Sequence, residues 1–357
     1  MSARPILILA GGTGGHVFPA LAVAGVFGEH SVPVHWLGGT SGIESRLVPA
    51  AGIAFTALPG RGLRGTGLGR KLLGPPRLVA AVLSAWRLIR RIEPRAAIGF
   101  GGYASGAGGL AAWCARCPLV VHEQNAIAGY TNRVLARLAA RVLTGFPGTF
   151  GKRGEFTGNP VREELTRLAP PAARYRERDG ALHLLVIGGS QGARVLNETV
   201  PAALARCEGR FEICHLAGPA HVETTSEAYR AAGVDARVEG FSGEMPALYG
   251  WADFAIARAG ALTLAEFATV GLPAILVPFP AAVDDHQSVN ARVFAAEGAA
   301  RLVPETELDA ASLAVMLNEF VVGGRALLGE MAERARRLAR PDAAERVARA
   351  VLEVAAP

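Results

Sequence analysis

Three glycine-rich turns carry residue types that suit phosphate binding, and each separates an apolar run from a run with helical spacing. The turns span residues 11–15, 99–106 and 188–192. Glycine allows positive φ angles and close approach of a backbone to a ligand. A helix N-terminus directs free N–H groups and a positive dipole at that ligand. Because two turns lie in the first half of the chain and one in the second, we expect a cleft between two similar halves that holds phosphates.

Polar side chains that suit acid–base chemistry or sugar binding follow several apolar runs. His16 ends the first turn at the start of an expected helix, whose dipole keeps the ring neutral and able to accept a proton; capping or packing is the alternative role. The run His-Glu-Gln-Asn at 122–125 follows an apolar strand and belongs in the crevice where open α/β sheets bind ligands. Glu266 suits ribose hydroxyls or a solvated helix face. Gln287 and Asn290 share a helix face and suit sugar hydroxyls.

The first turn does not match the dinucleotide-binding fingerprint. The pattern G-x-G-x-x-G starting at Gly12 requires glycine at position 17, which is Val17. The second apolar run, residues 35–39, also lacks the terminal acidic residue that binds ribose in dehydrogenases. We therefore expect no cofactor. Because no Asp-x-Asp motif is present, we expect no metal at the site either.

The third turn matches another pattern and leaves a second activity open. Residues 188–192 read G-x-S-x-G, the nucleophile elbow of hydrolases, with Ser190 as the nucleophile. Asp253 or Asp284, followed by His286, would complete a triad in the required order. The hydrolase interpretation leaves the first two glycine turns unexplained.

The chain of 357 residues has a length suited to two domains, and its charge is unevenly distributed. Residues 1–160 contain 17 basic and 5 acidic residues, whereas residues 161–357 contain 20 and 26. A basic half favours an anionic partner, although an arginine-rich composition is the alternative explanation. Two uncharged stretches, 96–115 and 267–283, are interrupted by glycines or prolines, so neither predicts a membrane-spanning helix.

The apolar runs alternate with helical spacing almost throughout. Strands are expected to begin near residues 6, 34, 54, 96, 119 and 142, and again near 182, 211, 236, 254, 274 and 300. Helices are expected between them, for example over 194–206 and 262–270. Such alternation predicts βαβ units, parallel sheets and two doubly wound domains. The boundary is expected near residues 158–162, where Pro160 favours an extended chain.

One segment departs from this alternation. Residues 61–95 contain nine basic residues and one acidic residue, interleaved with leucine and valine. Basic residues beside exposable leucines suit the surface of an anionic membrane. A helix with one core face and one solvated basic face is the alternative. We do not expect nucleic acid as a partner, because aromatic residues are few and no recognition motif is present.

Five runs of residues together resemble the MurG family of bacterial glycosyltransferases. They occur in order along essentially the whole chain, so the combined resemblance is far more specific than any glycine turn. The runs are GGTGGHVFPALA at 11–22, HEQN at 122–125, GGSQGA at 188–193, GALT at 260–263 followed by Glu266, and DHQ at 285–287 followed by Asn290 and Ala291.

The resemblance implies an α/β GT-B fold, in which two doubly wound Rossmann-like domains flank an interdomain cleft. Residues 1–160 would form an acceptor- and membrane-facing domain, and residues 161–339 a domain that binds the UDP-sugar. Residues 340–357 would form a helix that returns to the first domain. The protein would lie peripherally on the cytoplasmic face of the bacterial inner membrane, with residues 61–83 against its anionic surface.

The implied reaction moves N-acetylglucosamine from UDP-N-acetylglucosamine (UDP-GlcNAc) to the C4 hydroxyl of the muramyl sugar of lipid I. It inverts the anomeric centre, makes the β-1,4 link of lipid II for peptidoglycan and releases UDP. A UDP-GlcNAc 2-epimerase of the same fold is the alternative; it would act without an acceptor and would not need the basic, leucine-bearing segment.

The resemblance also assigns roles by position. His16 would be the base, with Asn125 and Glu266 as the other catalytic residues, and Tyr103 would join Asn125 on the acceptor side. Glu266 would hold the ribose. Donor-binding positions would be Thr13, Gly14, Gly15, Asn125, Arg162, Ser190, Ser242 (through its backbone), Ala261, Leu262, Thr263, Leu264, Ala265, Glu266, Gln287 and Asn290.

Overall fold

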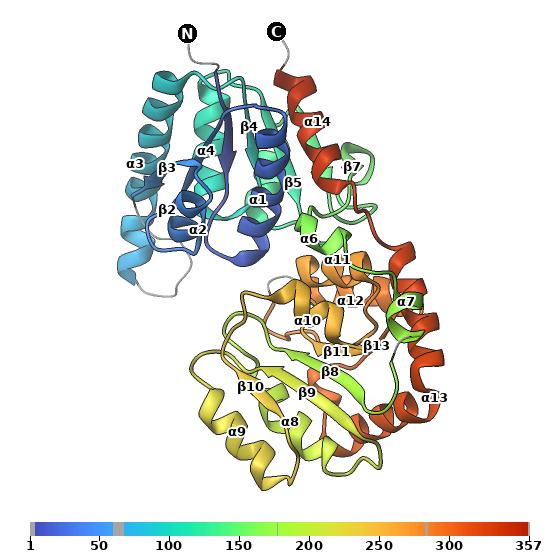
Figure 1. Cartoon of the computed structure of the whole chain (residues 1–357). Coiled ribbons are helices and arrows are strands. Elements are labelled where there is room, and N and C mark those ends of the chain that lie inside the picture. The colour runs from blue at the N-terminus through green and yellow to red at the C-terminus, as the bar shows by residue number, and fades with distance from the viewer. Residues whose placement is uncertain (1–3, 60–67, 177, 283–284, 356–357) are drawn as a thin grey trace. The chain divides into compact units, whose positions relative to one another are not determined.

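The computed structural model of the chain describes residues 4–59, 68–176, 178–282 and 285–355. The chain divides into two compact units, one built from Met1–Arg162 with Arg340–Pro357 and the other from Glu163–Ala339. Each unit contains one parallel sheet with helices packed on it (Figure 1). The prediction of two doubly wound α/β domains is therefore confirmed.

The sheet of the first unit has seven parallel strands in the order β3-β2-β1-β4-β5-β6-β7. The two central strands, β1 and β4, are buried at every position, because helices cover both faces of a parallel sheet. The strands are β1 (Ile6–Leu9), β2 (Val34–Gly39), β3 (Ala54–Leu58), β4 (Ala96–Gly99), β5 (Leu119–Glu123), β6 (Arg141–Thr144) and β7 (Gly154–Phe156).

Two hydrophobic clusters cover the opposite faces of this sheet. Ile6 and Ile8 pack with α1 and α14 on one face, while Leu7 and Leu9 pack with α3 and α4 on the other. Figure 1 shows α14, the last helix of the chain, beside α1. The helices of this unit are α1 (Gly14–Glu29), α2 (Glu44–Ala50), α3 (Leu68–Ile92), α4 (Gly102–Cys114), α5 (Tyr130–Leu135), η1 (Gly151–Arg153) and α14 (Ala343–Ala355).

The second unit has six parallel strands in the order β10-β9-β8-β11-β12-β13. They are β8 (Leu182–Ile187), β9 (Phe211–Leu216), β10 (Arg237–Glu239), β11 (Phe254–Ala257), β12 (Ala274–Leu276) and β13 (Ala300–Leu302). Its helices are α6 (Glu163–Thr166), α7 (Pro171–Arg176), α8 (Arg194–Leu204), α9 (Val222–Ala231), α10 (Met245–Trp251), α11 (Ala261–Val270), α12 (His286–Ala296), η3 (Glu305–Glu307) and α13 (Ala310–Arg337).

Each sheet has one point at which the strand order reverses, between β1 and β4 in the first unit and between β8 and β11 in the second. Open α/β sheets bind ligands at the carboxyl ends of strands beside such a point. The first two glycine turns follow β1 and β4, and the third follows β8. All three turns therefore lie where each sheet is expected to bind a ligand.

The predicted strands are all present and begin within one residue of the expected positions. The prediction lacks β7, which has three residues and pairs with β6 at the edge of the sheet. A segment this short shows no measurable periodicity in the sequence. The two uncharged stretches considered for membrane spans form β4 with α4, and the end of α11 with β12.

Among the described helices, only α13 is long and apolar enough to cross a membrane. Leu313, Leu317 and Phe320 on this helix are fully buried in the core of the second unit. Gly324 has non-helical angles (φ 54°, ψ −160°) and divides the helix at a kink. One face of this bent helix therefore packs on the core of the second unit.

Candidate active site

The first glycine turn joins β1 to α1 and presents an open helix N-terminus. Thr13 is the N-cap residue in extended conformation, and Gly12 has a φ of 96°. Thr13 and Gly15 are exposed, whereas His16 is half-buried. The first N–H groups of a helix have no partner within it, so this turn offers donors and a positive dipole to an anion.

The second glycine turn packs against the first and makes room for His16. Gly101 and Gly102 have φ angles of 106° and 81°. A Cβ at Gly101 would lie 2.9 Å from His16 Nε2, and a Cβ at Gly102 would lie 2.7 Å from the Gly11 carbonyl oxygen. The sequence predicts that these glycines allow close approach to a ligand; in the structure they also allow close packing around His16.

The run at 122–125 differs from the sequence prediction, because only Asn125 remains partly accessible. His122, Glu123 and Gln124 are at most 2% exposed. His122 Nε2 donates to the Gly158 carbonyl oxygen (3.0 Å), and Gln124 Nε2 donates to His122 Nδ1 (3.1 Å). Burial lowers the pKa of His122 to about 4, although the Gly158 hydrogen bond and the Glu123 charge act in the opposite direction. The ring is therefore neutral and structural.

Glu123 positions Asn125. Its Oε1 accepts from the backbone N–H of Asn125 (3.0 Å) and from the Asn125 side-chain amide (3.1 Å). Its Oε2 accepts from the Gly129 N–H and from Asn132 Nδ2, at 3.0 and 2.9 Å. The acidic residue thus shapes the loop after β5 and orients Asn125, the half-buried member of the run.

Two further predicted residues of the first unit lie close to these turns. The Arg162 guanidinium stacks over the Phe18 ring on α1, 5.5 Å from its centroid. A Cβ at Gly14 would lie 3.1 Å from the same ring, which places Arg162 beside the first turn. Tyr103 is half-buried on α4 and donates to the Pro59 carbonyl oxygen (3.3 Å); burial raises its pKa, against the opposing charge of Arg77.

The third glycine turn exposes Ser190 at the end of β8. A Cβ at Gly192, where φ is 77°, would lie 1.8 Å from the Ala217 carbonyl oxygen, so only glycine lets the turn pack against the end of β9. Asn197 on α8 donates to the same carbonyl oxygen (3.0 Å) and accepts from His215 Nε2 (3.0 Å). Burial lowers the pKa of His215 to about 3, so this network is neutral and fixes the turn.

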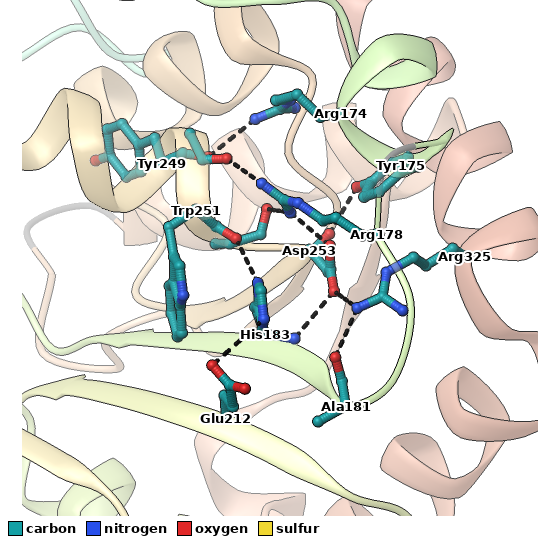
Figure 2. Close-up of polar contacts among 12 residues, drawn as sticks. Arg174, Tyr175, Arg178, Ala181, His183, Glu212, Tyr249, Trp251, Asp253 and Arg325 are labelled. Atoms are coloured by element: carbon teal, nitrogen blue, oxygen red, sulfur yellow. Dashed lines mark hydrogen bonds and ion pairs between the residues drawn. The ribbon is translucent and has the colours of Figure 1, made fainter.

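The contacts of Asp253 exclude it from a hydrolase triad. Its buried carboxylate accepts from Arg178 through Oδ1 (2.6 Å), and from Arg325 (2.8 Å) and a backbone N–H of β8 (3.0 Å) through Oδ2. Figure 2 shows Asp253 between the two guanidinium groups. The carboxylate is thus engaged and does not orient a histidine for Ser190. The other triad candidate, Asp284, lies outside the described residues.

Glu266 is buried and hydrogen-bonded, so it does not lie on a solvated helix face. It is 6% exposed on α11, and its Oε2 accepts from the Tyr249 hydroxyl on α10 at 2.7 Å. Within the predicted run 261–266, residues 262, 263 and 265 are half-buried and the others are buried. The hydroxyl of Ser242 accepts from the Glu244 N–H (3.1 Å) and shapes the turn before α10.

The prediction for Gln287 and Asn290 needs correction in one respect. Both lie on α12, but Asn290 is fully buried and donates to the Ala259 carbonyl oxygen (3.3 Å). Gln287 is half-buried, and its Oε1 accepts from the N–H groups of Ala259 (3.2 Å) and Phe279 (3.0 Å). The two residues therefore fasten the loop after β11, and Asn290 does not present its amide to solvent.

Sequence reasoning missed two residues at these switch points. Arg258, directly after β11, donates to the carbonyl oxygens of Val277 and Pro278 and pairs with Glu305. Glu44 on α2 is 1% exposed and binds the first glycine turn. Neither residue belongs to a motif, because the contacts that place them at the switch points, Glu44 with Gly12 and Arg258 with Val277 and Pro278, join positions that lie 19 to 32 residues apart.

Solved glycosyltransferases share this pair of doubly wound units. The calicheamicin glycosyltransferase CalG4 has a TM-score of 0.68 over 99% of this chain and 98% of its own; at 16% identity it compares the fold alone. The crystal structure of Acinetobacter baumannii MurG is 38% identical, with a TM-score of 0.83 over 98% of this chain and 99% of that chain. The fold is therefore that of a GT-B glycosyltransferase.

Residues 6–144 match the Glycosyltransferase family 28 N-terminal domain, and residues 183–347 match its C-terminal domain. A protein of Alkalilimnicola ehrlichii is 54% identical over 354 residues, covering 98% of this chain and 99% of its own length. One of Xylella fastidiosa is 48% identical over 353 residues, covering 98% and 96%. Both are named UDP-N-acetylglucosamine–N-acetylmuramyl-(pentapeptide) pyrophosphoryl-undecaprenol N-acetylglucosamine transferase. The chain belongs to glycosyltransferase family 28 and, within it, to the MurG family.

Proposed function

We propose that the protein transfers N-acetylglucosamine from UDP-GlcNAc to the C4 hydroxyl of the muramyl sugar of lipid I, which yields lipid II for peptidoglycan. The similarity to the transferases named above supports this substrate pair. The observation that carries the proposal is the placement of His16. It lies at an open helix N-terminus beside a topological switch point, where a base can meet an activated phosphate ester.

The donor is bound by helix N-termini and a few side chains. In the first unit, the turn at Thr13–Gly15 supplies N–H donors, and Arg162 adds a positive charge beside it. In the second unit, the turn at Ser190 supplies N–H and hydroxyl donors. Donors of this kind stabilise the negative charge that develops on a departing UDP. Glu266, oriented by Tyr249, accepts hydrogen bonds from the ribose hydroxyls. Gln287, which is half-buried on α12, would contact the sugar.

His16 is the general base of the proposed reaction. Its ring takes the proton of the C4 hydroxyl as that oxygen attacks C1 of N-acetylglucosamine. The C1–O bond to UDP breaks on the opposite face, so the anomeric centre inverts and UDP leaves with the electron pair. Asn125 and Tyr103 hold the acceptor sugar, and the loop contacts of Glu123 keep Asn125 in place.

A surface on α3 favours binding to an anionic membrane. We call it the α3 patch. It is an exposed helical face on which Val79, Leu83 and Trp86 alternate with Arg87 and Arg90. The Arg90 guanidinium lies 5.9 Å from the Trp86 ring. The sequence prediction covers residues 61–83, of which 61–67 lie outside the described residues; Trp86, Arg87 and Arg90 extend the surface beyond that prediction. Through this surface the protein would bind peripherally at the cytoplasmic face of the inner membrane.

The test is whether UDP release depends on the acceptor. Purified protein is mixed with UDP-GlcNAc, with or without a short-chain lipid I analogue, and UDP is followed in real time. The proposal predicts release only with the analogue. UDP release without an acceptor, accompanied by a C2-epimerised sugar, would instead establish the epimerase.

A further inference from the structure

Glu44 is a buried carboxylate held inside a cage of glycines. Its Oε1 accepts from the Gly39 N–H (2.9 Å) and its Oε2 from the Gly12 N–H (3.2 Å). A Cβ on Gly11 or Gly42 would lie 2.5 or 2.0 Å from a carboxylate oxygen. Among the described residues no basic side chain pairs with it, although burying a charge without a counter-charge is costly. The free-energy cost of burying this carboxylate suggests that Glu44 has a role besides packing.

The peptide unit between Gly11 and Gly12 connects Glu44 to His16. Its N–H donates to Glu44 Oε2, and its carbonyl oxygen lies 3.4 Å from His16 Nδ1. A carbonyl oxygen only accepts, so Nδ1 carries the hydrogen when this bond forms. The Thr13 hydroxyl oxygen, 3.3 Å from Nδ1, accepts in the same arrangement. A peptide whose N–H binds a carboxylate is a stronger acceptor at its carbonyl end.

We propose that Glu44 is the positioning residue of His16: acting through the Gly11–Gly12 peptide, it holds the ring as the Nδ1–H tautomer, with the lone pair on Nε2. This inference rests on the proposed function, in which His16 is the base. Nε2 is the nitrogen beside Gly101, where the second turn admits no side chain. In a catalytic triad, a carboxylate contacts the histidine directly and orients it. Here the carboxylate of Glu44 would orient His16 through a peptide group.

The described elements around the first two glycine turns carry other charged groups besides Glu44. Glu123 is engaged by Asn125, Asn132 and a backbone N–H, and Arg162 stacks on Phe18. The charged or titratable residues described for these elements include Glu44 on α2, Glu123 at the end of β5, Tyr103 on α4, and Arg162, whose guanidinium lies over the Phe18 ring of α1. Of these, Glu44 is the one whose carboxylate binds the Gly11–Gly12 peptide, and that peptide contacts the His16 ring.

The first measurement uses the full-length wild-type protein with ¹⁵N-labelled histidine, without substrate, at a pH where His16 is neutral. The His16 ring signals are assigned with a His16→Gln sample. The inference predicts protonated Nδ1 and unprotonated Nε2. The opposite tautomer overturns it. This measurement decides the inference even if a Glu44 variant fails to fold.

The second measurement compares Glu44→Gln with Glu29→Gln, a matched exposed change on α1 in the same unit. In Glu44→Gln we expect kcat to fall about tenfold, part of the roughly 10²–10⁴-fold that a general base contributes. The acid limb of kcat/KM for the acceptor should move to lower pH, because the imidazolium loses a nearby negative charge. A structural role alone would leave that limb in place, and an unmoved limb would overturn the inference.

Failure of the inference is separable from failure of the proposed function. If the wild-type protein forms the disaccharide while His16 is the Nε2–H tautomer, only the inference is wrong. If no disaccharide forms, the proposed function is wrong, and the tautomer measurement still decides how Glu44 acts on the ring.

Discussion

At the residue scale, burial separates structural histidines from the candidate base. His122 and His215 are enclosed, neutral and bonded at both ring nitrogens. His16 is half-buried at a helix N-terminus. His122 and His215 lie within strands β5 and β9, and His16 lies in the first turn of α1; because all three are histidines, residue type alone does not distinguish them. Only the folded surroundings distinguish the two enclosed rings from the more accessible ring of His16.

Replacing His16 by Ala should reduce turnover far more than donor binding. We expect kcat to fall by about 10²-fold or more, the contribution of a general base, while UDP affinity changes little. Steady-state kinetics and calorimetric titration with UDP give the two values. His30→Ala, at the exposed far end of the same helix, is the matched control. A loss confined to binding would assign His16 to substrate positioning.

Replacing Glu266 by Gln should weaken nucleotide binding. The amide oxygen of Gln can still accept from the Tyr249 hydroxyl, so we expect the fold to persist. A hydrogen bond to a charged group contributes about 1.5–3 kcal/mol, which corresponds to at least roughly tenfold in UDP affinity. Calorimetric titration of UDP measures the change, with the exposed Glu297→Gln as control. Unchanged UDP affinity would remove Glu266 from the ribose site.

At the element scale, the parts of the fold that the sequence predicts are those determined by local patterns. A buried parallel strand is an apolar run, and a glycine turn marks its end, which is why the strand positions were correct. β7 has three residues at a sheet edge and carries no such pattern. The roles of Glu44 and Asn290 were not predictable, because their partners at Gly12 and Ala259 lie 32 and 31 residues away.

The α3 patch gives a prediction for one helix. Trp86→Ser should weaken binding to phosphatidylglycerol vesicles by about tenfold, since burying a large apolar side chain contributes about 1.5–3 kcal/mol. Turnover of a soluble short-chain acceptor should stay the same. Vesicle co-sedimentation measures binding, and Val322→Ser, which removes an 89% exposed apolar residue on α13, serves as the control. Equal loss in both variants would contradict a specific role for α3.

At the scale of the whole molecule, two enclosed histidines among the described residues, His122 in the first unit and His215 in the second, make stability depend on pH. Burial lowers the pKa of His122 to about 4 and that of His215 to about 3, from an ordinary value of 6.5. Below pH 6.5 the unfolded chain binds a proton that the folded chain excludes. Above pH 6.5 these histidines therefore do not reduce the free energy of unfolding. Below pH 6.5 each histidine lowers that free energy by about 1.4 kcal/mol per pH unit, until the pH reaches the pKa of the ring in the folded chain.

Urea unfolding between pH 5 and 7.5 measures this dependence. We expect the free energy of unfolding to fall steadily below pH 6.5, and a His215→Gln variant to show a shallower decline. A free energy that is constant over this range, or an equal decline in the variant, would contradict the assignment of these two neutral rings.

The central claim is an inverting sugar transfer, and the anomeric configuration of the product tests it most directly. The wild-type protein is incubated with UDP-GlcNAc and a short-chain lipid I analogue, and the purified product is examined by proton NMR. The account predicts a disaccharide with a β link at the C4 oxygen of the muramyl sugar and one UDP per link. An α-linked product, or free N-acetylglucosamine in place of a disaccharide, would contradict it.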